Sequence, residues 1–153
     1  MSVAKIMNQD FQTVDMDDPL EWIKKLFDEQ RFHHVLVMSK GKLVGVISDR
    51  DVLKNISPYV GTVAETSRDT ATLKKKAHQI MTRQLVTVTD LDTVMTAVKT
   101  FNRHRISCLP VLNARGRPVG LLTWRDILRA MERIAERRSP NKAGAEGDLP
   151  GQS

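Results

Sequence analysis

The sequence holds a single cysteine, Cys108, among its 153 residues. One cysteine cannot form a disulfide within the chain, and it excludes the paired cysteine ligands of a structural zinc site. Charged residues interrupt every apolar stretch, so no run approaches the roughly 18 residues that predict a membrane helix. The first residues also lack the apolar core and cleavage site of a secretory signal. We therefore expect a cytoplasmic protein that does not contact a membrane.

The residue sets that carry catalysis are also missing. The sequence shows no Ser-His-Asp arrangement, no paired catalytic carboxylates and no phosphate-cradling glycine-rich loop. Two adjacent histidines, His33 and His34, would point to opposite faces of a strand and so make a poor metal site. Cys108 is expected in a buried strand, where cysteine usually acts as an inert apolar residue. These absences predict a protein that is not an enzyme and needs no metal or other required cofactor.

Acidic residues are fewer than basic ones, 18 against 24, which gives a formal charge of +6. Such an excess of positive charge can favour binding to nucleic acid, to an anionic surface or to small anionic ligands. Much of it lies in residues 74–76 and in residues 129–138, where the arginines are interleaved with Glu132 and Glu136. Solvated helix faces explain both runs, and no nucleic-acid-binding motif accompanies them. Nucleic-acid binding is therefore the less favoured interpretation.

What the sequence does contain is an internal repeat. Residues 3–54 align with residues 77–129 at an offset of 74, which becomes 75 after one inserted residue near Ala114. The matches keep one order with one gap, and they include Ile6-Met7 with Ile80-Met81, Asp18 with Asp92, Arg31 with Arg105, Val44-Gly45 with Val119-Gly120, and Arg50-Asp51 with Arg125-Asp126. Such self-similarity indicates two copies of one supersecondary unit.

Each copy predicts the same order of elements, β-α-β-β-α. Short β-branched runs at residues 11–14 and 85–88 favour strands, and an aspartate followed by an apolar stripe predicts a helix after each. Two apolar runs then flank a glycine-containing turn, which is typical of a hairpin. Ser48 and Thr123 are suitable N-cap residues for a second helix. Neither copy is large enough to bury a core alone, so we expect the two to pack together in an α+β fold.

These patterns divide the chain into four parts. We expect repeat 1 at residues 1–60, a linker at residues 61–76 and repeat 2 at residues 77–138. A helix is expected at residues 71–81, leading into the second copy. The tail, residues 139–153, is rich in Gly, Pro and Ala and has no apolar period, so we expect it to be disordered.

A motif recurs where the last strand of each copy meets its last helix. It reads Gly-Val-Ile-Ser-Asp-Arg-Asp at residues 45–51 and Gly-Leu-Leu-Thr-Trp-Arg-Asp at residues 120–126. With Leu109-Pro110-Val111 before the second turn, and Ile-Met before each first strand, the motif resembles that of tandem cystathionine-β-synthase (CBS) domains. The resemblance covers residues 1 to about 136. It implies two repeats related by a pseudo-twofold axis, two clefts between them, and a disc-like homodimer.

Members of that family bind adenosine-containing ligands in such clefts, among them AMP, ADP, ATP and S-adenosylmethionine. The resemblance therefore implies a regulatory sensor of an adenosine nucleotide or S-adenosylmethionine. Because the sequence shows no effector domain, the output would be a separate effector protein or the homodimer itself. The alternative is a dimerisation or scaffolding module whose clefts take no ligand.

The repeated motif could supply the chemistry of these clefts. A helix start presents unpaired backbone N–H groups and a hydroxyl that favour phosphate, an aspartate in the first turn can accept from a ribose diol, and a nearby arginine can neutralise phosphate. The residues expected in these roles are Ser48, Arg50 and Asp51 in the first copy and Thr123, Arg125 and Asp126 in the second. By resemblance, the adenine slot would use Thr13, Val14, Thr87 and Val88, together with the segment His33–Val35 or Ser107–Pro110, the latter including Leu109 and Pro110.

A plain capping box explains the same aspartates without any ligand, because a hydroxyl followed three residues later by an acid is common at helix starts. The two copies also differ: His33-His34 stands where the second copy has Ser107-Cys108, and Val35-Leu36 stands where it has Leu109-Pro110. We therefore expect unequal clefts. Asp126 is the better candidate for a ligand residue, and Asp51 the one that could serve only as a helix cap.

Overall fold

The structure, a computed structural model, describes residues 1–139 and contains the predicted unit twice. The first copy consists of β1 (Gln12–Asp15), α1 (Leu20–Glu29), β2 (His34–Ser39), β3 (Lys42–Ser48) and α2 (Asp49–Asn55). The second consists of β4 (Val88–Thr89), α5 (Val94–Arg103), β5 (Cys108–Leu112), β6 (Pro118–Thr123) and α6 (Trp124–Arg138). The α+β class and the β-α-β-β-α order are therefore confirmed. The predicted disorder of the tail concerns residues that, apart from Ser139, lie outside the described part.

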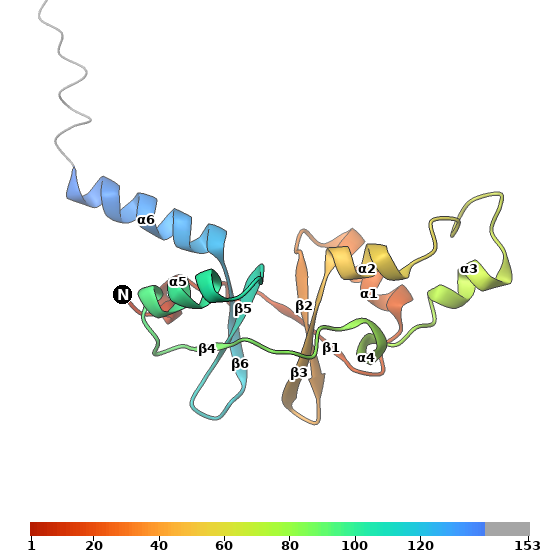
Figure 1. The fold of residues 1–153 in the computed structure, drawn as a ribbon, viewed down its shortest axis with the longest axis horizontal. Helices are drawn as coiled ribbons and strands as arrows, with labels where there is room; N and C mark the ends of the chain where they lie inside the picture. The colour runs from red at the N-terminus through yellow and green to blue at the C-terminus, as the bar shows by residue number, and fades with distance from the viewer. Residues whose placement is uncertain (140–153) are drawn as a thin grey trace, which may run out of the picture.

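Each copy forms its own three-stranded sheet, in the order β1-β2-β3 and β4-β5-β6. The first strand of each sheet runs parallel to the second, which pairs antiparallel with the third through a hairpin. The hairpin glycines, Gly41 and Gly116, have φ values of +77° and +75°, a region in which a side chain would be strained. The register shifts at matching places in both hairpins. The two halves lie side by side in Figure 1.

Strand alternation divides the core into three parts. Val35 and Val37 of β2 face α1 and α2, whereas Leu36 between them packs with Cys108 and Leu121 of the other half. This is the period of two that a strand imposes on its side chains. The second half has a core of its own, which includes Val88, Ala97, Leu109, Val111, Leu122 and Ile127. Each sheet is thus covered by its helices on one face and by the other half on the opposite face.

Each copy places its leading segment on the other half. The short 3-10 helix η1 (Val3–Lys5) joins the core of the second copy, and the Val3 amide donates to the Asp92 carbonyl at 2.8 Å. Helix α4 (Ala77–Ile80) joins the core of the first, and the Ala77 amide donates to the Asp18 carbonyl at 2.9 Å. Figure 1 shows the N-terminus beside α5 and α4 beside the first sheet. The two packed halves therefore exchange their first residues.

The helix expected at residues 71–81 is wrong as a continuous element. Helix α3 (Ser67–Thr72) ends just inside this range, and α4 begins only at Ala77, after a break. In the break, the carbonyls of Leu73 and Lys75 accept from the amides of Glu21 and Leu20, at 2.9 and 2.7 Å. These are amides of the first turn of α1, which have no partner within their own helix. The connecting segment does not continue as a helix, because two of its carbonyls accept from the amides of α1 instead.

No helix within residues 1–139 combines the length and the apolar content needed to cross a membrane.

The motif glycines mark where the exchanged segments cross the sheets. Gly45 on β3 lies under Met81, and a Cβ added there would stand 2.7 Å from Met81 Cγ and 2.9 Å from Met81 Cβ. Gly120 on β6 lies under Met7 in the same way, with Met7 Cγ at 2.8 Å. Beside each crossing a short antiparallel bridge forms, between Val46 and Thr82 and between Leu121 and Asn8. Glycine is required because the methionine side chain that lies over each position leaves no room for a Cβ.

We expect Gly45→Ala to lower the free energy of unfolding by about 1–3 kcal/mol, the range for overpacking a core site. The Cβ of Met81 cannot rotate away, because the neighbouring Thr82 is held to Val46 by backbone hydrogen bonds of 2.9 and 3.2 Å. Urea denaturation of both proteins measures the loss. Lys42→Ala, an exposed change on the same strand, should stay within about 0.5 kcal/mol of the parent. Equal stability of Gly45→Ala and Lys42→Ala would contradict the crowding.

Candidate functional site

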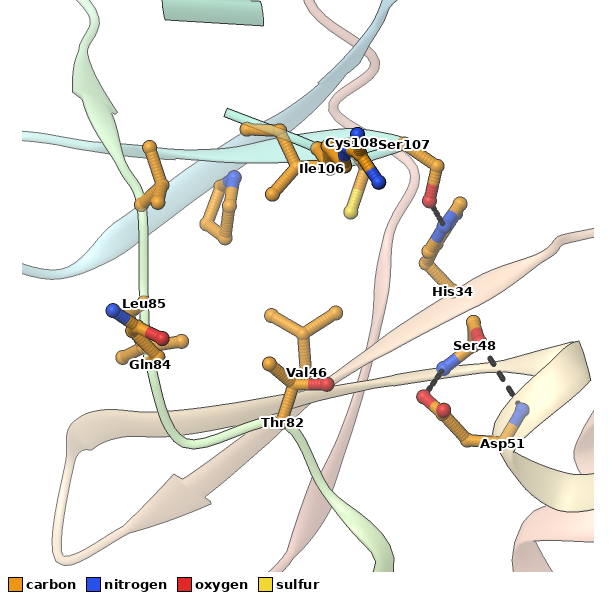
Figure 2. A pocket seen from close by; sticks show the side chains of 13 residues that line it. His34, Val46, Ser48, Asp51, Thr82, Gln84, Leu85, Ile106, Ser107 and Cys108 are labelled. Atoms are coloured by element: carbon orange, nitrogen blue, oxygen red, sulfur yellow. Dashed lines mark hydrogen bonds between the residues drawn. The ribbon is translucent and has the colours of Figure 1, made fainter. Parts of the chain in front are cut away.

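Two clefts lie between the halves, and each draws residues from both copies. The first, here called the Asp51 cleft, is a cavity of about 180 Å³. Its walls are His34, Val46, Ser48 and Asp51 of the first copy, together with residues from the segments 82–86 and 105–110 of the second. Figure 2 shows Thr82, Gln84 and Leu85 on one side and Ile106, Ser107 and Cys108 on the other. The segment that crosses Gly45 therefore forms one wall of the cleft.

The second, the Asp126 cleft, has about 460 Å³. It is lined by Leu121, Thr123, Arg125, Asp126 and Arg129 of the second copy, and by Asn8, Asp10, Phe11 and residues 31–34 of the first. Most of these positions are the repeat counterparts of those in the Asp51 cleft, since Thr123 corresponds to Ser48 and Asp126 to Asp51. The clefts are one site built twice. Only the Asp126 cleft falls within the roughly 300–1,000 Å³ of typical ligand pockets.

Both aspartates form the capping box that the sequence predicts as one of their roles. The Thr123 amide donates to Asp126 Oδ2 at 2.8 Å, and the Asp126 amide donates to Thr123 Oγ1 at 3.3 Å. Ser48 and Asp51 make the same pair of bonds, at 2.8 and 3.2 Å. In each case only Oδ2 is used, so Oδ1 has no hydrogen bond to any residue of the described chain. The cap leaves one carboxylate oxygen available to a ligand.

Two histidines, His33 and His34, occupy the junction between the clefts. His34 lines both clefts, and its Nε2 lies 2.8 Å from Ser107 Oγ across the boundary between the halves (Figure 2). Burial lowers the pKa of His34 below 6.5 and outweighs the opposing effect of Asp49. His33 lines only the Asp126 cleft, and its Nδ1 lies 2.8 Å from Asp49 Oδ2. By resemblance, the sequence analysis placed both histidines in a segment expected beside the adenine, and both line the Asp126 cleft.

Cys108 lies beside His34 in the wall of the Asp51 cleft and is 7% exposed. Desolvation by its apolar surroundings raises the pKa of its thiol to about 12. The thiolate, which is the reactive form of cysteine, is therefore scarce at neutral pH. The environment agrees with the apolar role predicted for this residue.

The structure brings together some of the predicted site residues and separates others. Ser48 and Asp51 line one cleft, and Thr123, Arg125 and Asp126 line the other. Arg50, Thr13 and Thr87 line neither cleft, and the first two are exposed. Val14, Val88 and Leu109 lie in the helix-covered cores, at 4%, 4% and 0% exposure.

The segments expected beside the adenine lie partly in the clefts: His33, His34, Ser107, Cys108 and Pro110 line them, whereas Thr13 and Thr87 do not. Val14 and Val88 face the cores, so the cleft walls come from residues earlier in each segment, Phe11 in one cleft and Leu85 and Val86 in the other. A shift of one residue along a strand exchanges its two faces, and periodicity alone does not say which face meets a ligand.

Pro110 and Asp126 line different clefts. Pro110 lines the Asp51 cleft, because the β5 face that carries it points to the other half while Leu109 points to its own helices. Sequence reasoning also missed Arg31 and Arg105, which line the Asp126 and Asp51 clefts respectively. The sequence could have indicated them, because an arginine stands at the same position of both copies. A charged residue at that position does not serve the apolar core, so it could have been assigned to the clefts.

Comparison with known proteins agrees with this geometry. The family model of the CBS domain matches residues 3–58 and 77–133. A CBS domain-containing protein of Dictyostelium discoideum is 29% identical over 136 residues, covering 88% of this chain and 93% of that protein. A homoserine O-acetyltransferase of Methanosarcina acetivorans is 28% identical over 126 residues, which cover 82% of this chain but only 21% of that enzyme.

Solved structures show the same arrangement. A CBS domain pair in complex with 5′-methylthioadenosine and S-adenosyl-L-methionine superposes with a TM-score of 0.69 at 25% identity, covering 86% of this chain and 99% of that one. A second protein, solved with AMP, gives a TM-score of 0.72 at 24% identity over 88% of this chain and 98% of that one. The latter likeness concerns the fold.

Lowering the pH should destabilise the protein through His34. Because the folded-state pKa of His34 lies below its ordinary value of 6.5, the unfolded chain binds the proton more tightly. The stability present above pH 6.5 is then lost as the pH falls through 6.5 towards the lower folded value. We therefore expect the unfolding free energy of the parent, relative to that of His34→Gln, to fall as the pH is lowered from about 8 to about 5.

Denaturant titrations at several pH values measure this difference, and the low-pH limit avoids the range in which carboxylates titrate. His104→Gln, a change at an exposed histidine, is the matched control. The groups that act on His34 are Asp49, His33 and Asp51. A parent-to-variant difference that stays constant with pH would overturn the role of burial at His34.

Proposed function

The chain belongs to the CBS domain family, and from this premise we propose that it is a regulatory module that binds an adenosine-containing ligand between its two repeats. The observation that carries the proposal is the free Oδ1 of Asp126 in a cleft of about 460 Å³. That oxygen can accept hydrogen bonds from a ribose diol while Oδ2 continues to cap α6. A charge-assisted bond of this kind is stronger than a neutral one.

The rest of the Asp126 cleft suits the other parts of such a ligand. Phe11 and Leu121 offer apolar surface to the adenine ring. Arg125 lies in the first turn of α6, where the unpaired amides and the helix dipole also favour an anion, and Arg129 lies one turn further along. The 25% identical CBS pair that binds 5′-methylthioadenosine and S-adenosyl-L-methionine supports adenosine as the recognised group, since both of its ligands contain it. AMP, ADP and ATP share the same group.

The proposal is a binding function without catalysis. The match to homoserine O-acetyltransferase covers about a fifth of that enzyme and falls on its CBS region. Binding between the halves would shift their packing, and a separate effector protein would respond to the shift. The free energy for such a change must come from unequal affinity for the two arrangements.

A homodimer is the second part of the proposal, and the helical surface supports it. Trp124, Leu128 and Met131 follow one face of α6 at spacings of four and three, yet they are 55%, 52% and 58% exposed. A groove of about 840 Å³ lies between α1 and α2 and contains apolar side chains of Phe27, Phe32, Val52, Leu53 and Ile56. An isologous dimer would place the α6 stripe of each copy in the groove of the other. The competing scaffolding function shares this dimer but binds no ligand.

We expect AMP, ADP, ATP or S-adenosylmethionine to raise the thermal stability of the protein. A ligand at about one hundred times its dissociation constant adds roughly 2.7 kcal/mol. Asp126→Asn keeps an oxygen for the cap but replaces the second oxygen with an amide, so binding should weaken by about 1.5–3 kcal/mol. Asp51→Asn is the matched change in the other cleft. Absence of any shift at millimolar ligand would contradict ligand binding, and unchanged affinity of Asp126→Asn would contradict the ribose contact.

The dimer is tested by Leu128→Lys, which puts a charge in the middle of the α6 stripe. We expect the parent to sediment as a dimer and the variant as a monomer, because an unpaired charge in an apolar interface is costly. Glu136→Lys introduces the same charge on α6 away from the stripe and should remain dimeric. A monomeric parent, or a dimeric Leu128→Lys, would exclude this interface.

A further inference from the structure

We infer that the two clefts divide their ligands by charge: the Asp126 cleft takes nucleoside di- and triphosphates, and the Asp51 cleft takes an adenosine-type ligand without a phosphate chain. The inference rests on the proposed function, since both clefts are first taken to bind adenosine. It follows from three differences between the two equivalent clefts: their charged side chains, their volumes, and the lengths of the helices α2 and α6 that follow the capping boxes.

The charged side chains are distributed unequally. Three arginines, Arg31, Arg125 and Arg129, line the Asp126 cleft against two carboxylates, Asp10 and Asp126. In the Asp51 cleft, Arg105 alone stands against Asp51. A phosphate chain carries several negative charges, and multiple arginine contacts are what offset them. Only the Asp126 cleft offers more than one arginine.

The difference arises in the helix that follows each capping box. Arg125 and Arg129 are one turn apart on α6, and both line the cleft. Their repeat counterparts on α2 are Arg50 and Lys54. Arg50 lines neither cleft, and Lys54 lines the groove between α1 and α2 instead. The same two positions are therefore cationic in both copies, but they reach the cleft in only one.

The Asp126 cleft also continues along α6. Asp126 and Arg129 line a second hollow of about 510 Å³, together with Ile6, Glu132 and Arg133. Arg125, Arg129 and Arg133 recur every four residues and so follow one side of the helix. A chain of phosphates that leaves the helix start would pass these groups in turn. Helix α2 ends at Asn55 and provides no such extension.

The walls of the Asp51 cleft favour an uncharged group. Val46, Leu85, Val86, Ile106, Cys108 and Pro110 all line it. Its cavity of about 180 Å³ is less than half that of the Asp126 cleft. A phosphate chain placed here would lie beside the Asp51 carboxylate and meet one arginine, Arg105, so most of its charge would have no cationic partner. An adenosine or thioadenosine group brings no such charge.

Calorimetry with adenosine, AMP, ADP and ATP tests the division on the full chain. We expect ATP to bind one site per chain and adenosine to bind two. ATP should bind at least about tenfold more tightly than AMP, which corresponds to one further charged hydrogen bond. Raising the salt concentration should weaken ATP binding and leave adenosine binding nearly unchanged. This salt comparison needs no variant and so does not depend on the folding of one.

The double variant Arg125→Gln/Arg129→Gln should lose the preference for ATP and bind it as weakly as adenosine. Arg50→Gln/Lys54→Gln removes the same number of positive charges from the counterpart positions and should keep parental ATP affinity. Thermal unfolding without ligand checks that both variants fold. In Asp126→Asn, ATP binding should fall while adenosine binding at the Asp51 cleft is retained.

The possible failures are distinguishable. If none of the four ligands binds, the proposed function fails and the division fails with it. If they bind with equal affinity, if ATP fills two equivalent sites, or if Arg50→Gln/Lys54→Gln costs as much as Arg125→Gln/Arg129→Gln, adenosine sensing stands and the division by charge is overturned.

Discussion

The structure depends on two backbone crossings, each between the leading segment of one repeat and the last strand of the other. Thr82 pairs with Val46, and Asn8 pairs with Leu121, directly beside the motif glycines Gly45 and Gly120. These crossings hold Val3 in the second core and Ala77 in the first, so neither half completes its core without a segment of the other. They also create the clefts, because residues 82–86 form a wall of one as they return from the crossing to their own sheet. Fold and site therefore share one constraint.

One aspartate at each helix start can both cap its helix and hold the proposed ligand. An aspartate at the third helical position is common because it satisfies the amide of the N-cap residue. In Asp51 and Asp126 that duty occupies Oδ2 alone. A carboxylate held rigidly by its own cap presents its second oxygen at a fixed place, which lowers the entropy lost when a ligand binds. From the sequence, capping and ligand binding looked like alternative roles for these aspartates. The geometry shows that the two roles are compatible.

The sequence was most informative where a pattern acts locally and occurs twice. Strand alternation, hairpin glycines and the N-cap residues Ser48 and Thr123 predicted the elements correctly because each depends on near neighbours. The helix expected at residues 71–81 failed because distant amides of α1 take the carbonyls of Leu73 and Lys75. The side of the sheet on which each cleft residue lies could not be predicted for the same kind of reason. Pro110 lies near Asp51 because its face of β5 points to the other half. That orientation depends on the exchange of segments between the halves, and no local sequence pattern contains this information.

Duplication kept the backbone and the cap while the surroundings diverged. The second copy has a helix of 15 residues after its capping box, whereas the first has one of 7. His34 of the first copy replaces a position that holds Cys108 in the second, and it bonds to Ser107 across the boundary. His34 lines both clefts, so one side chain belongs to the walls of both. A group that moved His34 in one cleft would alter the wall of the other. Two unequal sites that share a wall can be coupled, and coupling between sites is reciprocal by thermodynamic necessity.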